Sequence, residues 1–236
     1  MNIELSASFG FATKENDTQI TSDILAKAEN HMYQNKIYEH LGVRSDTVDI
    51  IMNTLFAKSN RESLHSKRVS KICQAIATKM KLSEDYINRI KIAGLLHDIG
   101  KIGVIEQILN KNTALSNNEK KEIQKHPEIG WRILYATNEF SELAEFILEH
   151  HERWDGKGYP KGLKGEEISL EARIISVADA FDAMTSVRSY KNKKTKEEAI
   201  EELKKCSGTQ FDPKIVNIFI NHVLKTNRNV SKLKLK

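Results

Sequence analysis

The chain has 236 residues, which is room for one medium-sized domain with an appendage, and 39% hydrophobic and 29% charged residues are typical of soluble globular proteins. No stretch approaches the roughly 18 apolar residues of a membrane span, and the N-terminus lacks the basic-then-apolar pattern of a signal peptide. The net charge of +5 is modest, and much of it comes from the basic tail at residues 226–236. We expect that tail to be a solvated, frayed end, with nucleic-acid binding as the less favoured interpretation.

Two segments form a first block that ends at Gly42. Ile3 to Thr13 alternates apolar and small residues, which predicts a strand. Thr21 to Lys36 places its apolar residues on one stripe, which predicts an amphipathic helix.

From Asp46 onward the apolar residues recur with the helical period, and the chain has three prolines to interrupt it. We predict helices over Val48 to Lys58 and over Glu62 to Met80. The second has a common apolar face, made of Leu64, Val69, Ile72, Cys73, Ile76 and Ala77. Ser83 is expected to cap the next helix, which runs to about Leu96.

The second half of the chain has clear helix starts. Capping boxes are predicted for Ser116 with Glu119 and for Thr195 with Glu198. Asp212-Pro213 is expected to open the last helix, which reaches Leu224. The glycine-rich stretch from Arg153 to Glu167 is the longest break, and such loops beside ligand residues are often functional.

Cys73 and Cys206 lack a CxxC spacing, which favours reduced thiols and a cytoplasmic protein.

Four of the eight histidines gather in three places, at His97-Asp98, His126 and His150-His151. Neutral imidazoles and carboxylates are the ligands that divalent Zn, Mn and Fe prefer. His97 and Asp98 end an apolar helix, which would hold them rigidly, and Gly100 permits a turn. Taken alone, the pair also fits a capping histidine beside a surface aspartate. His150-His151 is the better single indication of a metal site.

Three of the candidate ligands are ambiguous when each is taken alone. His65 lies on or beside the apolar stripe of its helix and, taken alone, fits a buried core histidine better than a metal ligand. His126-Pro127 begins a helix from which the ring can point across a cleft. Asp179 lies in an apolar run, where a charged carboxylate needs either an arginine or a metal ion as partner. Together, the candidates offer five imidazoles and two carboxylates, which suits two ions that share Asp98.

At this point the motifs resemble the HD-GYP family of bacterial phosphohydrolases, the subset of the HD superfamily that degrades cyclic di-GMP. The resemblance covers roughly residues 60 to 225 and implies a mainly α protein, an HD-superfamily helical bundle preceded by the small strand-plus-helix segment. The matching segments, in family order, are His65 to Val69, His97 to Gly103, His126-Pro127, His150 to Pro160 and Ala178 to Thr185.

The resemblance implies a ligand set. One metal is held by His65, His97, Asp98 and Asp179. Asp98 bridges to a second metal, which is completed by His126, His150 and His151. Some family members hold a third ion with a glutamate four residues before the first histidine. Arg61 occupies that position here and argues against a third ion, although Glu62 lies one helical turn from His65 and keeps it open.

The resemblance also implies substrate contacts. Lys101, Arg188 and Lys191 lie where family members contact phosphates, and Tyr159 lines the substrate pocket. Two ions about 3.5–4 Å apart can hold a hydroxide between them and aim it at phosphorus. Asp98 and Lys101 are the expected catalytic residues, and the general acid stays open between a metal-bound water and Lys101. Trp154 is assigned either a stacking or a structural role.

The first block has a weaker resemblance. Leu5 to Ala12 and Leu25 to Lys36 are similar to the C-terminal end of a GGDEF, or diguanylate cyclase, domain whose catalytic part is absent. It is either a remnant or the edge of a longer parent protein. The expected organisation is a GGDEF-like remnant at 1–42, a linker helix at 43–59, the HD-GYP domain at 60–225 and the tail at 226–236.

The favoured function is hydrolysis of cyclic di-GMP to linear pGpG, with continuation to GMP left open. The alternatives are a catalytically idle dinucleotide sensor and a phosphohydrolase for another nucleotide, such as cyclic GMP-AMP. The absence of a thiolate ligand favours iron or manganese over zinc. Pairing of two chains through Val48 to Lys58, and GGDEF or sensor domains as partners, are further expectations; DNA and membrane insertion are not expected.

Overall fold

The computed structural model describes residues 12–14, 20–22, 24–25, 28, 50–111, 113–137, 140–186 and 194–224. The chain divides into two compact units, Met1–Ile50 and Ile51–Lys236. In the first unit, the predicted strand from Ile3 to Thr13 lies almost wholly outside the described residues. The described positions 21, 22, 24, 25 and 28 of the predicted helix are helical.

The second unit is built from helices, and its described residues contain no strand beyond two isolated bridges. Residues 51–58 are helical and lead directly into α2. The remaining elements are α2 (Asn60–Lys79), α3 (Glu84–Leu96), η1 (Ile99–Gly103), α4 (Glu106–Leu109), α5 (Asn117–Ile123), α6 (His126–Tyr135), α7 (Ser141–Glu149), η2 (Gly165–Glu167), α8 (Leu170–Thr185), α9 (Lys196–Lys205), α10 (Pro213–Ile218) and η3 (Phe219–Leu224). The predicted mainly helical fold is confirmed.

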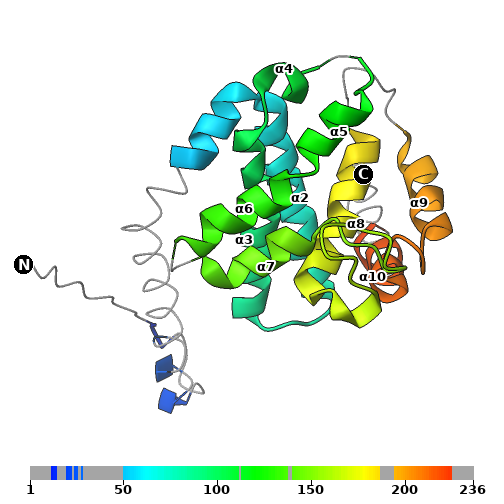
Figure 1. Cartoon of the computed structure of the whole chain (residues 1–236). Coiled ribbons are helices and arrows are strands. Elements are labelled where there is room, and N and C mark those ends of the chain that lie inside the picture. The colour runs from blue at the N-terminus through cyan, green and yellow to red at the C-terminus, as the bar shows by residue number, and fades with distance from the viewer. Residues whose placement is uncertain are drawn as a thin grey trace, which may run out of the picture. The chain divides into compact units, whose positions relative to one another are not determined.

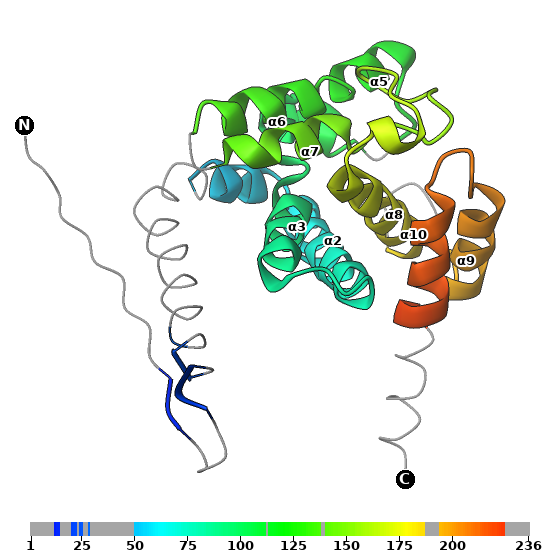
Figure 2. The same ribbon diagram turned by 90° about the horizontal axis from the view of Figure 1, so that it is seen from below.

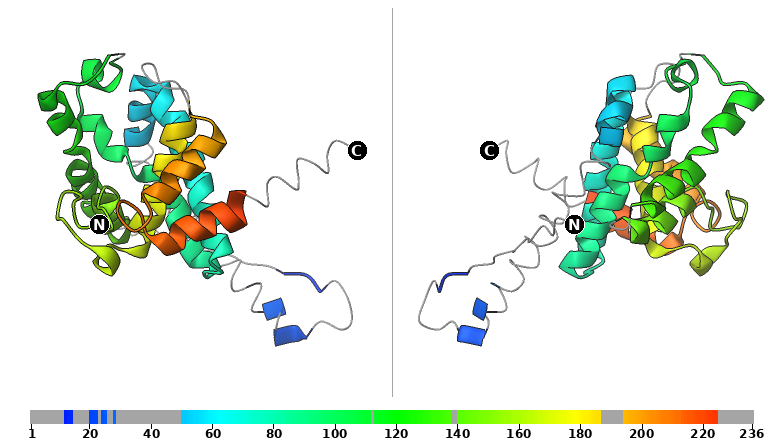
Figure 3. Two further views of the ribbon diagram at one scale, coloured as in Figure 1. Left: turned by 90° about the vertical axis from the view of Figure 1, so that its right-hand side faces the viewer. Right: turned by 60° about the vertical axis from the view of Figure 1, so that its left-hand side comes forward.

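Two helix pairs and a central helix make up the bundle. α2 packs against α3, α6 packs against α7, and α8 contacts α2, α3 and α7 (Figures 1 and 2). α9 and α10 both pack on α8, which Figure 3 shows from the side. The helices therefore enclose a core to which α2, α3, α7 and α8 each contribute fully buried aliphatic side chains.

The predicted helix starts are confirmed by the side-chain caps. Ser83 accepts a hydrogen bond from the N–H of Tyr86, and capping boxes form at Ser116 and Thr195. Asp212 accepts from the N–H of Lys214 at the start of α10. The predicted last helix does reach Leu224, but its second half, η3, is a π-helix.

The prediction of which residues form the buried face of α2 is partly wrong. Val69, Cys73 and Ile76 are fully buried as expected, but Leu64 is 51% exposed. At 100° per residue, Val69 and Ile76 share a face with His65, whereas Leu64 points toward the side of Lys67 and Lys71. The buried face of α2 therefore carries His65 into the protein interior.

The helical residues 51–58 pack on the segment that follows η1. Leu55 is buried with Val104 and Leu109. Lys58 Nζ donates to the carbonyl of Ile102 at 2.9 Å, and Asn110 Nδ2 donates to the carbonyl of Lys58 at 2.9 Å. This packing fixes the loop after His97-Asp98 against the start of α2.

Candidate metal centre

The seven predicted metal ligands all lie in the described part of the chain and come together in the second unit. His65 comes from α2, His97 and Asp98 follow α3, and His126 begins α6. His150 and His151 follow α7, and Asp179 lies in α8. Figure 2 shows these helices converging. Arg188 and Lys191, predicted to contact phosphates, lie outside the described residues.

A first group joins His65, His97 and Asp98, whose ligand atoms lie within 4.8 Å of one another. His97 Nε2 is 3.1 Å from Asp98 Oδ2, and His65 Nε2 is 3.6 Å from the same oxygen. Asp179 Oδ1 lies 3.2 Å from His65 Nε2. All four residues expected at one metal are therefore adjacent.

A second group joins His126, His150 and His151, again with ligand atoms within 4.8 Å. His126 Nε2 lies 3.3 Å from His150 Nε2, and the rings of His150 and His151 are 4.0 Å apart between centroids. Three imidazoles in this space make a nitrogen-rich site suited to a divalent transition metal.

Asp98 lies between the two groups. Its Oδ2 atom faces His97, and its Oδ1 atom lies 3.1 Å from His126 Nε2. The two oxygens of one carboxylate are thus directed to different groups of histidines. Such an arrangement suits a carboxylate that is shared by two cations.

Three of the histidines are oriented by backbone carbonyls three residues earlier. The Nδ1 atoms of His97 and His126 donate to the carbonyls of Gly94 (3.0 Å) and Ile123 (2.6 Å). His150 Nδ1 donates to Ile147 at 2.6 Å. Because a carbonyl can only accept, Nδ1 carries the hydrogen in each ring, and Nε2 presents its lone pair to the site.

These lone pairs provide the test of whether a metal fits. His97 Nε2 is buried and has no hydrogen-bond partner. It faces a carboxylate oxygen, which also offers only lone pairs, and buried groups of this kind need a cation between them. Imidazole nitrogen with carboxylate oxygen is a donor set that binds Zn, Mn and Fe. The residues therefore fit divalent metal ions.

The electrostatics of the two groups differ. Burial lowers the pKa of His65, but hydrogen bonds to Asp179, Asp182 and Asp98 outweigh it and raise that pKa to about 11. Burial and then the charge of His126 lower the pKa of His151 to about 3, and burial holds the pKa of His150 well below its usual range. The carboxylates around His65 thus favour a bound cation, whereas the lowered pKa values keep His150 and His151 neutral, which is the form that binds metal.

Lys101 is held against the shared carboxylate. Its Nζ lies 2.7 Å from Asp98 Oδ2 and 2.9 Å from Glu62 Oε2. Arg61 in turn lies 3.1 Å from Glu62 Oε1 and donates to the carbonyl of Leu109. Burial raises the pKa of Asp98, but His97 and Lys101 outweigh it and hold that pKa well below its usual range. Asp98 is therefore fully ionised near neutral pH.

The glycine-rich turn closes one side of the second group. Tyr159 stacks on His151 with 4.9 Å between ring centroids. Glu152 is buried and accepts from the backbone N–H groups of Lys161, Gly162 and Leu163 at 2.6–3.1 Å. The ring of Trp154 lies 5.7 Å from the guanidinium of Arg173, a contact that supports its structural role.

Gly100 has a different role from the one predicted. It is not among the glycines with positive φ and lies in the 3₁₀ helix η1. A Cβ added there would lie 1.9 Å from the carbonyl oxygen of His126 and 2.5 Å from the nitrogen of Gly130. Gly100 is therefore required because the backbones of η1 and α6 approach closely, which brings Asp98 to His126.

Two residues that contact the site or its surrounding turn, Asp182 and Glu152, were not predicted from the sequence. Asp182 lies 2.7 Å from His65 Nδ1, and Glu152 anchors the turn. Asp182 is three residues after Asp179 and so lies on the same face of α8, a spacing that could have indicated it. Glu152 directly follows His150-His151, but its targets are backbone groups that no pattern in the sequence reveals.

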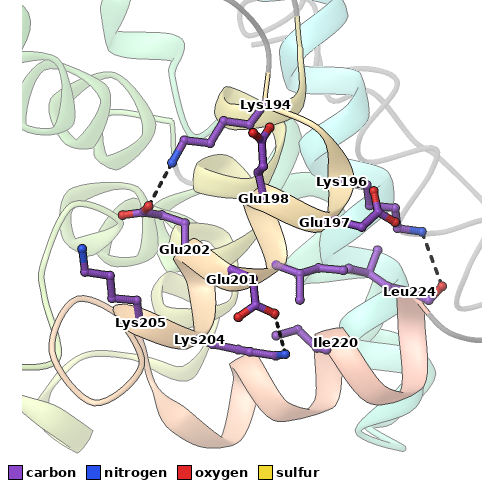
Figure 4. Close-up of a pocket in the computed structure, with 11 residues that line it drawn as sticks. Lys194, Lys196, Glu197, Glu198, Glu201, Glu202, Lys204, Lys205, Ile220 and Leu224 are labelled. Atoms are coloured by element: carbon purple, nitrogen blue, oxygen red, sulfur yellow. Dashed lines mark hydrogen bonds and ion pairs between the residues drawn. The ribbon is translucent and has the colours of Figure 1, made fainter.

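A cavity of about 210 Å³ opens beside the first group. Its lining includes His65, Arg68, Lys101 and Asp182. A larger cavity of about 700 Å³ lies along α9 (Figure 4) but contains none of the candidate ligands. Among its charged lining residues, Lys194 pairs with Glu202 and Lys204 pairs with Glu201, and Ile220 and Leu224 are among its apolar lining residues. Of the two cavities, the smaller one is therefore the one lined by a candidate metal ligand, His65.

Comparison with known proteins identifies the class of protein that this fold and site define. The model of a family described as "HD domain" matches residues 49–215, so the chain belongs to that family. The matches also support the narrower HD-GYP assignment. Within the described residues, no helix combines the length and apolar character needed to cross a membrane.

Individual relatives agree with the family. The chain is 44% identical over 173 residues to a cyclic di-GMP phosphodiesterase of Thermotoga maritima, a match that covers 72% of this chain and 47% of the relative. It is 37% identical over 174 residues to 3'3'-cGAMP-specific phosphodiesterase 2 of Vibrio cholerae, with 73% and 33% covered. The chain thus spans less than half of the length of these curated relatives.

A solved structure of a cyclic GMP-AMP-specific phosphodiesterase of Vibrio cholerae has the same fold. It aligns with a TM-score of 0.55 and 25% identity over 73% of this chain and 46% of the other. The expected HD-superfamily bundle is confirmed, and membership of the HD domain family implies binding of divalent metal.

Proposed function

We propose that this chain is a metal-dependent phosphodiesterase that hydrolyses cyclic di-GMP to linear pGpG, with GMP as a further product. The family, the relative named a cyclic di-GMP phosphodiesterase and the adjacent ligands support this proposal. The observation that carries it is the position of Asp98, whose two oxygens face His97 and His126 at 3.1 Å each.

In this proposal, His65, His97, Asp98 and Asp179 hold one ion, and His126, His150 and His151 hold the other with Asp98. Divalent ions bound there supply Lewis acidity toward phosphoryl oxygens and lower the pKa of water. Two ions fit better than three. Glu62 is the carboxylate that would have to bind a third ion, and it is already paired with Lys101. The lack of a thiolate ligand favours iron or manganese.

The chain's own residues would bind and orient the diester. Lys101 places a fixed positive charge 2.7 Å from Asp98, at the edge of the cavity where a phosphate would approach. Tyr159, which stacks on His151, would line the substrate pocket beside the second group. Arg188 and Lys191 stay predicted phosphate contacts. Burial lowers the pKa of Lys101, but Asp98 and Glu62 outweigh it and raise that pKa, which favours a charged ammonium facing the phosphate.

A second substrate is favoured by a specific observation. The relative at 37% identity is named as specific for 3'3'-cGAMP, so cyclic GMP-AMP is the alternative substrate of the same site. A catalytically idle sensor is less favoured, because all seven expected ligands are present and adjacent.

The wider organisation is also proposed. Residues 1–42 would be the GGDEF-like remnant, residues 43–59 a linker helix, residues 60–225 the catalytic domain and residues 226–236 a basic tail. The protein would be cytoplasmic. Pairing of two chains through Val48 to Lys58 would have to use the face away from Leu55, because Leu55 is buried against Val104 and Leu109.

Product chromatography tests the proposal. Anaerobically purified chain would be incubated separately with cyclic di-GMP and with cyclic GMP-AMP, and metal content would be measured on the same sample. We expect linear pGpG and bound iron or manganese. Preferred turnover of cyclic GMP-AMP would support the second substrate. Tight dinucleotide binding without any product would support the sensor and contradict an enzyme.

A further inference from the structure

His65 differs from three other histidines of the site in how its Nδ1 atom is held. His97, His126 and His150 donate to the carbonyls of Gly94, Ile123 and Ile147. Each of these carbonyls belongs to the last four residues of a helix. Such carbonyls have no intrahelical partner and are free to accept.

His65 lies in the interior of α2, at the sixth of its 20 residues. In a helix interior the backbone carbonyls already accept from the following turn, so His65 needs an acceptor from elsewhere. Asp182 of α8 supplies it. Its Oδ2 atom lies 2.7 Å from His65 Nδ1, although the two residues are 117 positions apart in the chain.

Asp182 is itself fixed from its other side. It is 3% exposed, and Arg68 donates to it through Nε at 2.5 Å and through Nη2 at 2.9 Å. Ser186 Oγ donates to Oδ1 at 3.2 Å. A bidentate guanidinium with a third donor holds a carboxylate in one orientation. The chain of contacts therefore runs from Arg68, which lines the cavity, through Asp182 to His65.

We infer that Asp182 is a positioning residue for the first metal group and that Arg68 supports it. By accepting the Nδ1 hydrogen, Asp182 leaves His65 Nε2 as the lone-pair donor that faces Asp98 and Asp179. Carboxylates that hold a ligand histidine in this way usually raise metal affinity by about 10- to 100-fold. The inference rests on the proposed metal-dependent function, because it concerns the same site.

The test compares zinc binding by the full chain and its variants, by competition with a chelator of known affinity. Asp182→Ala should weaken one of two zinc sites by about 10- to 100-fold and leave the other unchanged. Arg68→Gln should weaken the same site by less than about 10-fold, because Asp182 remains. Arg89→Gln is the matched control. Arg89 has a side-chain exposure of 43% against 42% for Arg68, and its partner Glu142 lies outside the site.

A second readout separates positioning from general stability. In the zinc-loaded chain, long-range ¹H–¹⁵N NMR spectra should show His65 with a protonated Nδ1 and a metal-bound Nε2. Asp182→Ala should shift or broaden that pattern while the signals of His126 and His150 persist. If circular dichroism shows that Asp182→Ala does not fold, Arg68→Gln decides the question by the same two measurements.

The outcomes are distinct. A wild-type chain without zinc binding would overturn the proposed function and this inference with it. Wild-type zinc binding with equal affinity and an unchanged His65 signal in folded Asp182→Ala would overturn the inference alone. If Asp182→Ala does not fold, wild-type zinc affinity at both sites of Arg68→Gln would overturn the inference.

Discussion

The Nε2 atoms of His126 and His150 face each other at 3.3 Å. Each ring uses its Nδ1 hydrogen on a backbone carbonyl, so both Nε2 atoms carry lone pairs. Two lone pairs at this distance repel unless a cation lies near both. The second group is thus preorganised for a metal before any ion binds.

Replacement of His150 should therefore remove one ion. We expect His150→Gln to lower the metal content from about two ions per chain to about one, because the first group keeps its own ligands. Hydrolysis should be lost with the second ion. Metal analysis after gel filtration measures the content, and His222→Gln, an exposed histidine of η3, is the control. Two retained ions in His150→Gln would exclude it as a ligand.

Arg188 is predicted to act on the substrate and not on the metal. We expect Arg188→Ala to raise KM for cyclic di-GMP, since a fixed positive charge near the phosphates is lost. The metal content should stay at the wild-type value. Steady-state kinetics with metal analysis checks both, and unchanged kinetics would count against the phosphate role.

Gly100 should tolerate no side chain. Gly100→Ala places a Cβ 1.9 Å from the backbone oxygen of His126, and we expect a loss of about 3 kcal/mol or more in the free energy of unfolding. Gly103→Ala is the matched control, because its Cβ would meet the flexible end of Ile129 at 3.0 Å. Its effect should stay within about 1 kcal/mol. Urea denaturation of the metal-free chains measures both, and equal stabilities would contradict the close approach.

Glu119 should make stability depend on acidic pH. The Lys111 ammonium and the N–H of Ser116 lower the pKa of Glu119 from 4.5 to about 2. A carboxyl group with a lowered pKa in the folded state contributes stability that is fully present above the unfolded pKa near 4.5. That contribution is lost as the pH falls toward 2.

The measurement is the difference in free energy of unfolding between the wild type and Glu119→Gln. It should be constant from neutral pH to about pH 5.5 and shrink between pH 4.5 and 2. Glu122→Gln is the control on the same helix, because Glu122 pairs with Lys125 outside the capping box. A difference that does not vary with pH would contradict the account.

The helix starts could be predicted because their signals are local. Ser83, Ser116, Thr195 and Asp212 cap helices within three residues of themselves, so the sequence contains both partners of each bond. The adjacency of the metal ligands was predicted from the family resemblance, and the structure brings all seven together.

The supporting contacts could not be predicted in the same way. His65 and Asp182 are 117 residues apart, and Glu62 meets Lys101 across 39 residues. Their pairing depends on how α2, η1 and α8 pack, which helical periodicity alone does not specify. The wrong prediction that Leu64 is buried has a related cause. His65 and Glu62 lie on the buried face of α2, and a pattern built from apolar residues alone leaves such polar positions out.

The shared carboxylate of Asp98 is the central claim, and Asp98→Asn tests it most directly. The amide keeps the shape but lacks the charge that two cations would share. Metal content and cyclic di-GMP hydrolysis would be measured together on the folded variant and the wild type. We predict loss of nearly all hydrolysis and fewer than two ions per chain. Substantial turnover with two ions retained would contradict the account.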